Sequence, residues 1–290
     1  MTLGVWDAWA IGAKTLTYAA TFSAAGAVWF LRYCNGLLGG EERRKIRRIV
    51  FSSAGLSLFG GAAQLLITAG SMQGSAAGML DGSLLHLVWQ AGAGRDNAIR
   101  AVGLLLAAVG VLSDRPAWPA LFGAAMAATS FAWTGHARSF DAGPSPLLLG
   151  VHLLGVAFWL GALAPLLIVA RNGDTSRVAP ATARFGAAAL YVVAGMVAAA
   201  SCLLFRLLGD ITQLWASDYG RFMMLKLGLV AVLLGLAAFN KLRLTPRLIA
   251  GNTAAVTSLR HSVRMELMLG VLILGITAAL TTIAGPPALD

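Results

Sequence analysis

Eight apolar stretches of about 20 residues constrain this chain more than any other feature. They cover residues 11–32, 47–70, 97–113, 117–136, 147–170, 184–208, 219–240 and 263–284. An apolar helix of this length spans a bilayer and satisfies its backbone hydrogen bonds internally. Apolar residues make up 58% of the chain and charged residues only 12%, which excludes an ordinary soluble domain. The sequence therefore predicts an all-α polytopic membrane protein, with eight transmembrane helices in one integral membrane domain, 1–290.

The positive charges gather on one side of this predicted layout. Of the 22 Lys and Arg residues, 15 lie at Arg32, at Arg115 or in the segments 41–48, 171–184 and 241–264. Because cytoplasmic loops carry such an excess, these segments are predicted to face the cytoplasm and both termini the periplasm. The net charge of +10 is divided among juxtamembrane loops. That placement argues against a nucleic-acid partner and is typical of contact with the anionic headgroups of a lipid bilayer.

Two segments share a pattern that suggests an internal duplication. Residues 89–104 begin Trp-x4-Gly-Arg-x4-Arg, and residues 215–228 begin Trp-x4-Gly-Arg-x4-Lys. The match predicts two parallel four-helix repeats, 1–144 and 145–290, an arrangement found in transporters. The alternative is chance similarity between helix starts at the outer face, where Trp and Arg are common anchors.

A pair of histidines is the best indication of function. His136 closes one predicted span and His152 opens the next, and the connection 137–146 between them is short. Helices joined in this way are usually antiparallel neighbours, so the two imidazoles are expected to approach each other. Imidazole is the commonest metal ligand. The pair predicts a metal site at the periplasmic rim, and interfacial histidines that bond headgroups or water are the alternative.

Three residues of the predicted outer loop 71–96 could complete such a site. Met72 and Met79 precede His86 at equal spacing, and thioether with imidazole suits copper, especially the cuprous ion. Methionine in an apolar protein is more often packing, and that interpretation is also expected for Met196 within a span. The fourth histidine, His261, is predicted to lie alone at the inner surface.

Three further features bear on mechanism. Glu266 is an intramembrane carboxylate, a functional candidate unless it pairs with Arg264 or a neighbouring helix. Cys34 and Cys202 are placed near opposite ends of the bundle and are not expected to form a disulfide. No nucleotide-binding motif and no CxxC is present, so neither ATP-driven nor thiolate-mediated metal transfer is supported, and we expect no enzymatic activity.

Three groups of residues resemble the CopD family of bacterial copper-resistance and copper-homeostasis membrane proteins. They are 133–137 (Trp-Thr-Gly-His-Ala) with 151–163, 219–227 with 237–246, and 259–270. The resemblance implies copper handling in the bacterial inner membrane, from periplasm toward cytoplasm, commonly with a separate periplasmic carrier of the CopC type. Compared residue by residue, the resemblance implies that His136 and His152 are metal ligands, and it gives less support to His86.

The leading hypothesis is a copper-binding inner-membrane protein that takes copper at its outer face. Few polar groups beyond the histidines are expected along the bundle, so copper binding is better supported than translocation. One rival is a haem electron-transfer protein with His136 and His152 as axial ligands, although both lie close to a short loop. The other is a copper assembly or sensing subunit that does not transport.

Overall fold

The computed structural model describes residues 4–113, 117–132, 145–171, 174–208, 210 and 212–283, and their regular structure is entirely helical. The long helices are α1 (Val5–Tyr33), α2 (Gly40–Gln73), α4 (Gly94–Gly110), α5 (Trp118–Thr129), α6 (Ser145–Arg171), α7 (Thr175–Leu208), α9 (Asp218–Phe239) and α11 (Ala254–Ile283). The short ones are η1 (Asn35–Leu37), η2 (Ala76–Leu80), α3 (Gly82–Val88), η3 (Trp89–Ala93), η4 (Ser130–Ala132), α8 (Gln213–Ala216), η6 (Asn240–Leu244) and α10 (Thr245–Ile249).

Five of these helices are long and apolar enough to cross a membrane. They are α2, α6, α7, α11 and the segment Asp218–Ile249, which joins α9 to α10. The other three predicted spans fall on α1, α4 and α5, of which α4 has 17 residues and α5 has 12. The all-helical membrane fold is thus confirmed, whereas the total of eight spans stays a prediction.

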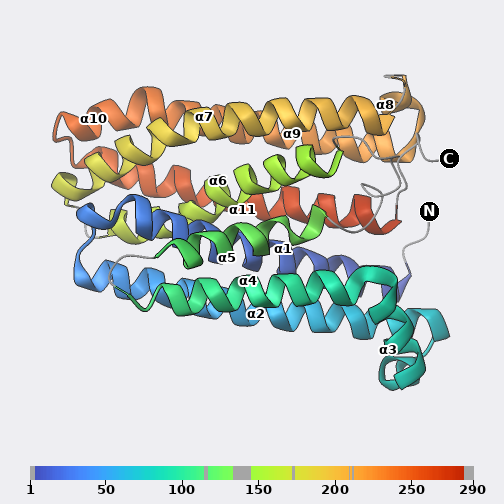
Figure 1. The fold of residues 1–290 in the computed structure, drawn as a ribbon. Coiled ribbons are helices and arrows are strands. Elements are labelled where there is room, and N and C mark those ends of the chain that lie inside the picture. Colours follow the sequence, from blue (N-terminus) through green and yellow to red (C-terminus); the bar gives the residue numbers. More distant parts are fainter. Residues whose placement is uncertain are drawn as a thin grey trace.

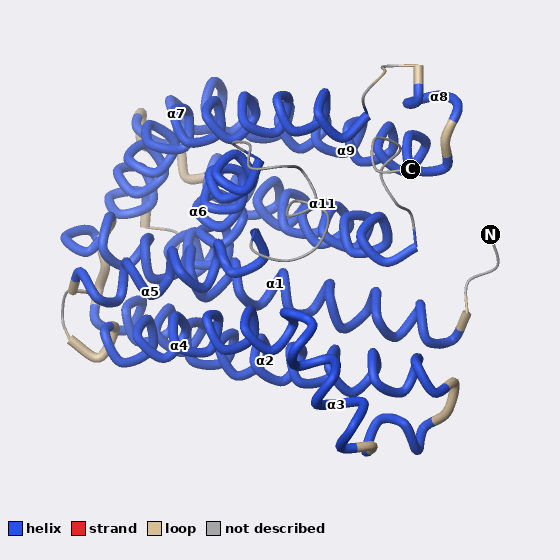
Figure 2. Tube along the Cα trace, turned by 45° about the vertical axis from the view of Figure 1, so that its right-hand side comes forward, coloured by secondary structure: helices blue, strands red, loops and turns tan. Residues whose placement is uncertain are grey.

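The long helices run side by side in one bundle (Figure 1). α1 lies in its middle and packs against α2, α5, α6 and α11. The pair α2–α4 flanks one side and α7–α9 the other (Figure 1). α1 begins and α11 ends at the same end of the bundle, beside α3 and α8, and Figure 2 shows the same grouping. We call this the α3–α8 end.

The contact between α1 and α6 is the closest packing of the core. A Cβ atom on Gly26 would overlap the main chain of Ala157 and Gly161, and one on Gly161 would overlap the main-chain oxygen of Phe22. Small residues of this kind allow helix backbones to approach within a membrane, where packing rather than the hydrophobic effect holds helices together. This approach joins the two halves of the chain.

The predicted loops are more helical than expected. The segment 71–96 contains η2, α3 and the π-helix η3, and Asp81 begins α3 by accepting hydrogen bonds from the backbone amides of Ser83 and Leu84. α7 starts at Thr175 and α11 at Ala254, so both extend well into the positive segments. These ends were missed because apolar content locates a span but not the polar turns that continue its helix.

The two cysteines are free, as predicted. Cys34 is buried just after α1, and Cys202 is exposed near the end of α7. Since the two helices run antiparallel in the bundle, the thiols lie toward opposite ends of it (Figure 1).

Candidate metal site at the start of α6

The predicted histidine pair is only partly described by the structure. His136 belongs to residues 133–144, which lie outside the described residues. The helices that bracket this segment do pack together, since α5 and η4 both contact the start of α6. The neighbourhood of the two spans is therefore confirmed, and the meeting of His136 with His152 stays a prediction.

His152 turns toward α7. Its Nδ1 atom lies 3.4 Å from the main-chain oxygen of Met196, and its side chain is half-buried. Gly150 lies near Thr129 of α5, and two residues correspond to a rotation of about 200° around an α-helix. The imidazole therefore emerges on the side of α6 that faces α7.

The hydrogen bond to the main-chain oxygen of Met196 determines which nitrogen of the His152 imidazole carries the hydrogen. A carbonyl oxygen only accepts, so Nδ1–H of His152 must donate to it. The neutral ring then keeps its free lone pair on Nε2. Metal-binding histidines usually donate their second nitrogen to a carbonyl or carboxylate, which fixes the ring for coordination.

Met196, which the sequence assigned to packing, is buried beside His152. Its side chain is 5% exposed and packs over Gly155, one turn along α6 from His152, where a Cβ on Gly155 would lie 3.3 Å from the sulfur. The sequence alone could have placed Met196 near His152. The connection near residue 173 is short, so the helices before and after it are expected to be antiparallel neighbours. Residues at about equal distances before and after this connection, such as His152 and Met196, then face each other. The expectation that Met196 packs in the interior is confirmed, and a role for its thioether as a metal ligand is a separate proposal.

Lys226 of α9 acts electrostatically on His152. The side chain of Lys226 is half-buried, and one face of α9 lies against the bundle. Metal binding at His152 requires the neutral imidazole.

The residues of the predicted outer loop lie apart from α6. His86 is exposed on α3 and its Nε2 atom lies 2.8 Å from Nε2 of Gln90. Met72 is 53% exposed at the end of α2, and Met79 lies beside Gly70 and Trp6. α3 lies at the same end of the bundle as the start of α6 but on the α2–α4 side (Figures 1 and 2). Their part in a shared site stays a prediction.

No group of three His, Cys, Asp or Glu side chains with metal-binding geometry occurs among the residues that the structure describes. A site at His152 must therefore draw on other ligand types or on the segment 133–144. The Met196 thioether is one such ligand type, and it favours cuprous copper over hard cations.

Two family models match the chain. Copper resistance protein D matches residues 179–280, and copper resistance protein D-like, N-terminal domain, matches residues 5–145. The chain belongs to the copper resistance protein D family. The resemblance seen in the sequence is thereby confirmed, and it makes this CopD chain a copper-resistance-related membrane protein. No curated protein and no solved structure matches it.

A group of polar side chains is buried where α1 and α2 of this CopD chain meet. Gln64 of α2 donates from Nε2 to the Thr17 hydroxyl of α1 at 2.6 Å, and the hydroxyls of Thr21 and Ser57 bond each other at 2.7 Å. Thr17, Thr21 and Ser57 are all fully buried. These groups bond one another within the α1–α2 contact, so the expectation of a thin polar lining along a copper path stays a prediction.

Arg100 extends this polar region toward the α3–α8 end. Its guanidinium is 4% exposed, donates to Oδ1 of Asn97 at 2.5 Å and lies 4.5 Å from the centre of the Phe131 ring. Phe131 belongs to η4, directly before the segment that contains His136. Buried polar groups thus reach from α2 through α1 and α4 to the region of the predicted site.

Proposed function

We propose that this protein binds copper at the α3–α8 end of the bundle and carries it from periplasm toward cytoplasm. It would serve copper homeostasis and resistance as a multi-pass protein of the bacterial inner membrane and would act as a transporter rather than an enzyme. Membership of the CopD family supports the copper and the membrane. The ligands, the direction and the transport itself are the proposal.

The observation that carries this proposal is the orientation of His152. A histidine at the lipid interface would turn its ring outward to headgroups or water. Here the ring faces α7, with Nδ1 at the Met196 carbonyl and Nε2 available. In the proposed site, Nε2 of His152 and the Met196 thioether hold copper with His136, while His86, Met72 and Met79 attract the ion at the rim.

The sidedness follows from charge. The ends of α1, α2, α6, α7 and α10 opposite the α3–α8 end carry most of the Lys and Arg residues, and such loops remain in the cytoplasm. The copper site then opens to the periplasm. A periplasmic carrier of the CopC type, as a separate chain, is the partner proposed to deliver the ion there.

Reconstituted vesicles test the proposal. Vesicles that contain wild-type protein are expected to accumulate copper above protein-free vesicles, and His152→Ala is expected to abolish the difference. Binding without accumulation would instead favour the assembly or sensing role. A Soret band in the absorption spectrum of the purified protein would favour the bis-histidine haem alternative.

A further inference from the structure

A carboxyl group lies deep in the bundle, beside Trp159 of α6, which is about 10 Å along that helix from His152. Glu266 is 2% exposed, about 18 Å along α11 from its start. Nδ2 of Asn240, itself 8% exposed, donates a hydrogen bond to Oε1 of Glu266. The Trp159 side chain of α6 is its second hydrogen-bonding neighbour. Three separate helical segments thus converge on this one carboxyl, and Asn240 confirms the neighbouring-helix alternative for Glu266.

No basic side chain forms an ion pair with Glu266 in the part of the chain that the structure describes. Lys241, next to Asn240, donates to the main-chain oxygen of Gly186 on α7. Residues 155–168 of α6 and 15–31 of α1 contain no charged residue. Of the charged or titratable side chains on η6, α10 and the first half of α11, Lys241 and Arg260 are half-buried, and Arg243, Arg247, His261 and Arg264 are exposed.

An ionised carboxylate in such surroundings is costly because no cation compensates its charge. Addition of one proton to a carboxylate oxygen removes that charge, and the acid can then donate a hydrogen bond. An acceptor for it is at hand, because Oδ1 of Asn240 is buried and has no hydrogen-bond partner among the described residues. The Asn240 amide can therefore serve either form of the carboxyl by presenting its NH2 group or its oxygen.

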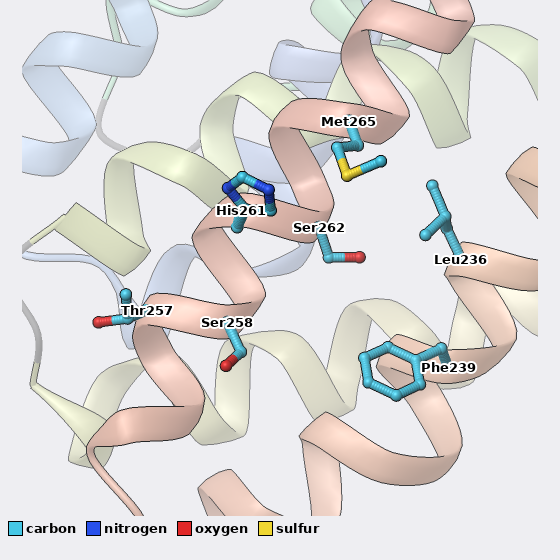
Figure 3. A pocket seen from close by; sticks show the side chains of 7 residues that line it. All are labelled: Leu236, Phe239, Thr257, Ser258, His261, Ser262 and Met265. Carbon is cyan, nitrogen blue, oxygen red and sulfur yellow. The ribbon is translucent and has the colours of Figure 1, made fainter.

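A groove between α9 and α11 includes Met265, the residue directly before Glu266. It is lined by Leu236, Phe239, Thr257, Ser258, His261, Ser262 and Met265. Ser262 lies one turn before Glu266 on α11, and its hydroxyl points toward Leu236 and Phe239 of the facing helix (Figure 3). That hydroxyl is also buried without a partner. Ser262 therefore lies between the groove that it lines and Glu266, which follows one turn later on α11.

The backbone of α9 changes at the same place. Asn240–Leu244 form the π-helix η6, and the Thr245 hydroxyl donates to the main-chain oxygen of Asn240 at 2.9 Å. Single π-helical turns inside α-helices occur frequently at functional sites. The segment that positions Asn240 is therefore locally distinct from the regular helix on either side.

We infer that Glu266, held by Asn240 and Trp159, is a proton-binding site inside the bundle, and that its proton enters and leaves past Ser262 through the α9–α11 groove. A role for Glu266 in coupling rests on the proposed copper transport. In that role, Glu266 would bind a proton in one conformation of the bundle and release it in another while copper moves.

Labelling with dicyclohexylcarbodiimide tests the proton site without copper, because this apolar reagent modifies protonated carboxyl groups. Mass spectrometry of the purified wild-type protein is expected to find the adduct on Glu266 at neutral pH, with less adduct as the pH rises. Glu42 is the matched control: it is equally buried, at 3% exposed, but lies 3.7 Å from Arg177 and accepts from the Gly39 amide at 2.7 Å. It should stay unmodified. An unmodified Glu266 would overturn the inference.

Two further labelling experiments test the route that the proton takes and whether the bound ion is a proton. Ser262→Ala should slow the labelling several-fold, whereas Ser258→Ala, on the same groove but exposed, should not. Equal rates in both variants would overturn the route. Protection of Glu266 by sodium, with no effect of pH, would overturn the proton in favour of an alkali ion at these oxygen atoms.

Copper uptake separates this inference from the proposed function. In vesicles, a pH gradient is expected to change the uptake rate of the wild type but not of Glu266→Gln, whose amide keeps the shape of the side chain. Labelled Glu266 in a protein that moves no copper would refute transport and leave the proton site standing. Uptake that depends equally on the gradient in both proteins would refute the coupling role.

Discussion

Nδ1 of His152 lies 3.4 Å from the main-chain oxygen of Met196, so α7 fixes the ring that α6 carries. The acceptor belongs to the backbone and persists whatever side chain stands at position 196. The side chain of Met196 can therefore be altered to test the thioether while the orientation of His152 is kept.

Met196→Leu preserves volume and removes only the sulfur. If the thioether is a copper ligand, affinity for Cu(I) should fall by at least roughly 10-fold, the smallest loss typical of removing even an outer-shell partner. Affinity for Cu(II) should change less because thioethers prefer the softer ion. Competition with a Cu(I)-specific chelator measures this. Met223→Leu, at a buried position in α9, is the control. Equal Cu(I) affinity in both variants would remove Met196 from the site.

Gly161→Ala should destabilise the protein, because the added Cβ would overlap the main-chain oxygen of Phe22 and push α1 away from α6. Overpacking of this kind costs about 1–3 kcal/mol. Unfolding in detergent micelles measures the loss. Gly235→Ala in α9, where nothing lies within 4 Å of the new atom, should not lower stability. Unfolding of Gly161→Ala at the wild-type midpoint would show that the close approach is absent.

The Cys34 thiol should become reactive only at a higher pH than an ordinary cysteine does. Burial raises the pKa of its thiol to about 11, against the opposing charge of Arg184. Because the folded value exceeds the unfolded one, the thiol stabilises the fold fully below about pH 8.5, and that contribution is lost as the pH rises toward 11.

A Cys202→Ala variant, which leaves Cys34 as the single cysteine, allows the measurement. Its alkylation by a maleimide should be negligible at pH 8 in the folded protein and rapid after unfolding. Fast alkylation of the folded variant at pH 8 would contradict the burial of this thiol.

The two ends of the bundle should label from opposite sides of the membrane. In a cysteine-free background, Ser75→Cys lies at the α3–α8 end and Thr253→Cys lies between α10 and α11. A membrane-impermeant maleimide added to spheroplasts should modify Ser75→Cys alone. The reverse pattern would invert the proposed direction of copper entry.

Sequence reasoning located helices better than contacts. Each apolar run falls on a helix, because a membrane-spanning helix needs an unbroken run of apolar residues and such a run is visible in the sequence. The partners of Glu266 could only be stated as alternatives, since the choice among Arg264 and other helices depends on how α9 and α11 are rotated. That rotation is set by packing along the whole helix, which no short pattern records.

The candidate site shows the same division. His152 stood out because imidazole is rare and costly at the edge of a span. Met196 was assigned to packing, which its burial confirms, and its proposed role as a ligand comes only from the register of α6 against α7. The pairing of His136 with His152 concerns a residue outside the described segments and remains a prediction from the chain order.

Copper binding by the purified protein tests the central claim most directly. Wild type, His136→Ala, His152→Ala and His261→Ala would be titrated with copper under identical conditions, His261 lying on the α9–α11 groove away from the site. We predict that binding is lost in His136→Ala and His152→Ala and retained in His261→Ala. Unchanged binding in both His136→Ala and His152→Ala would contradict the account.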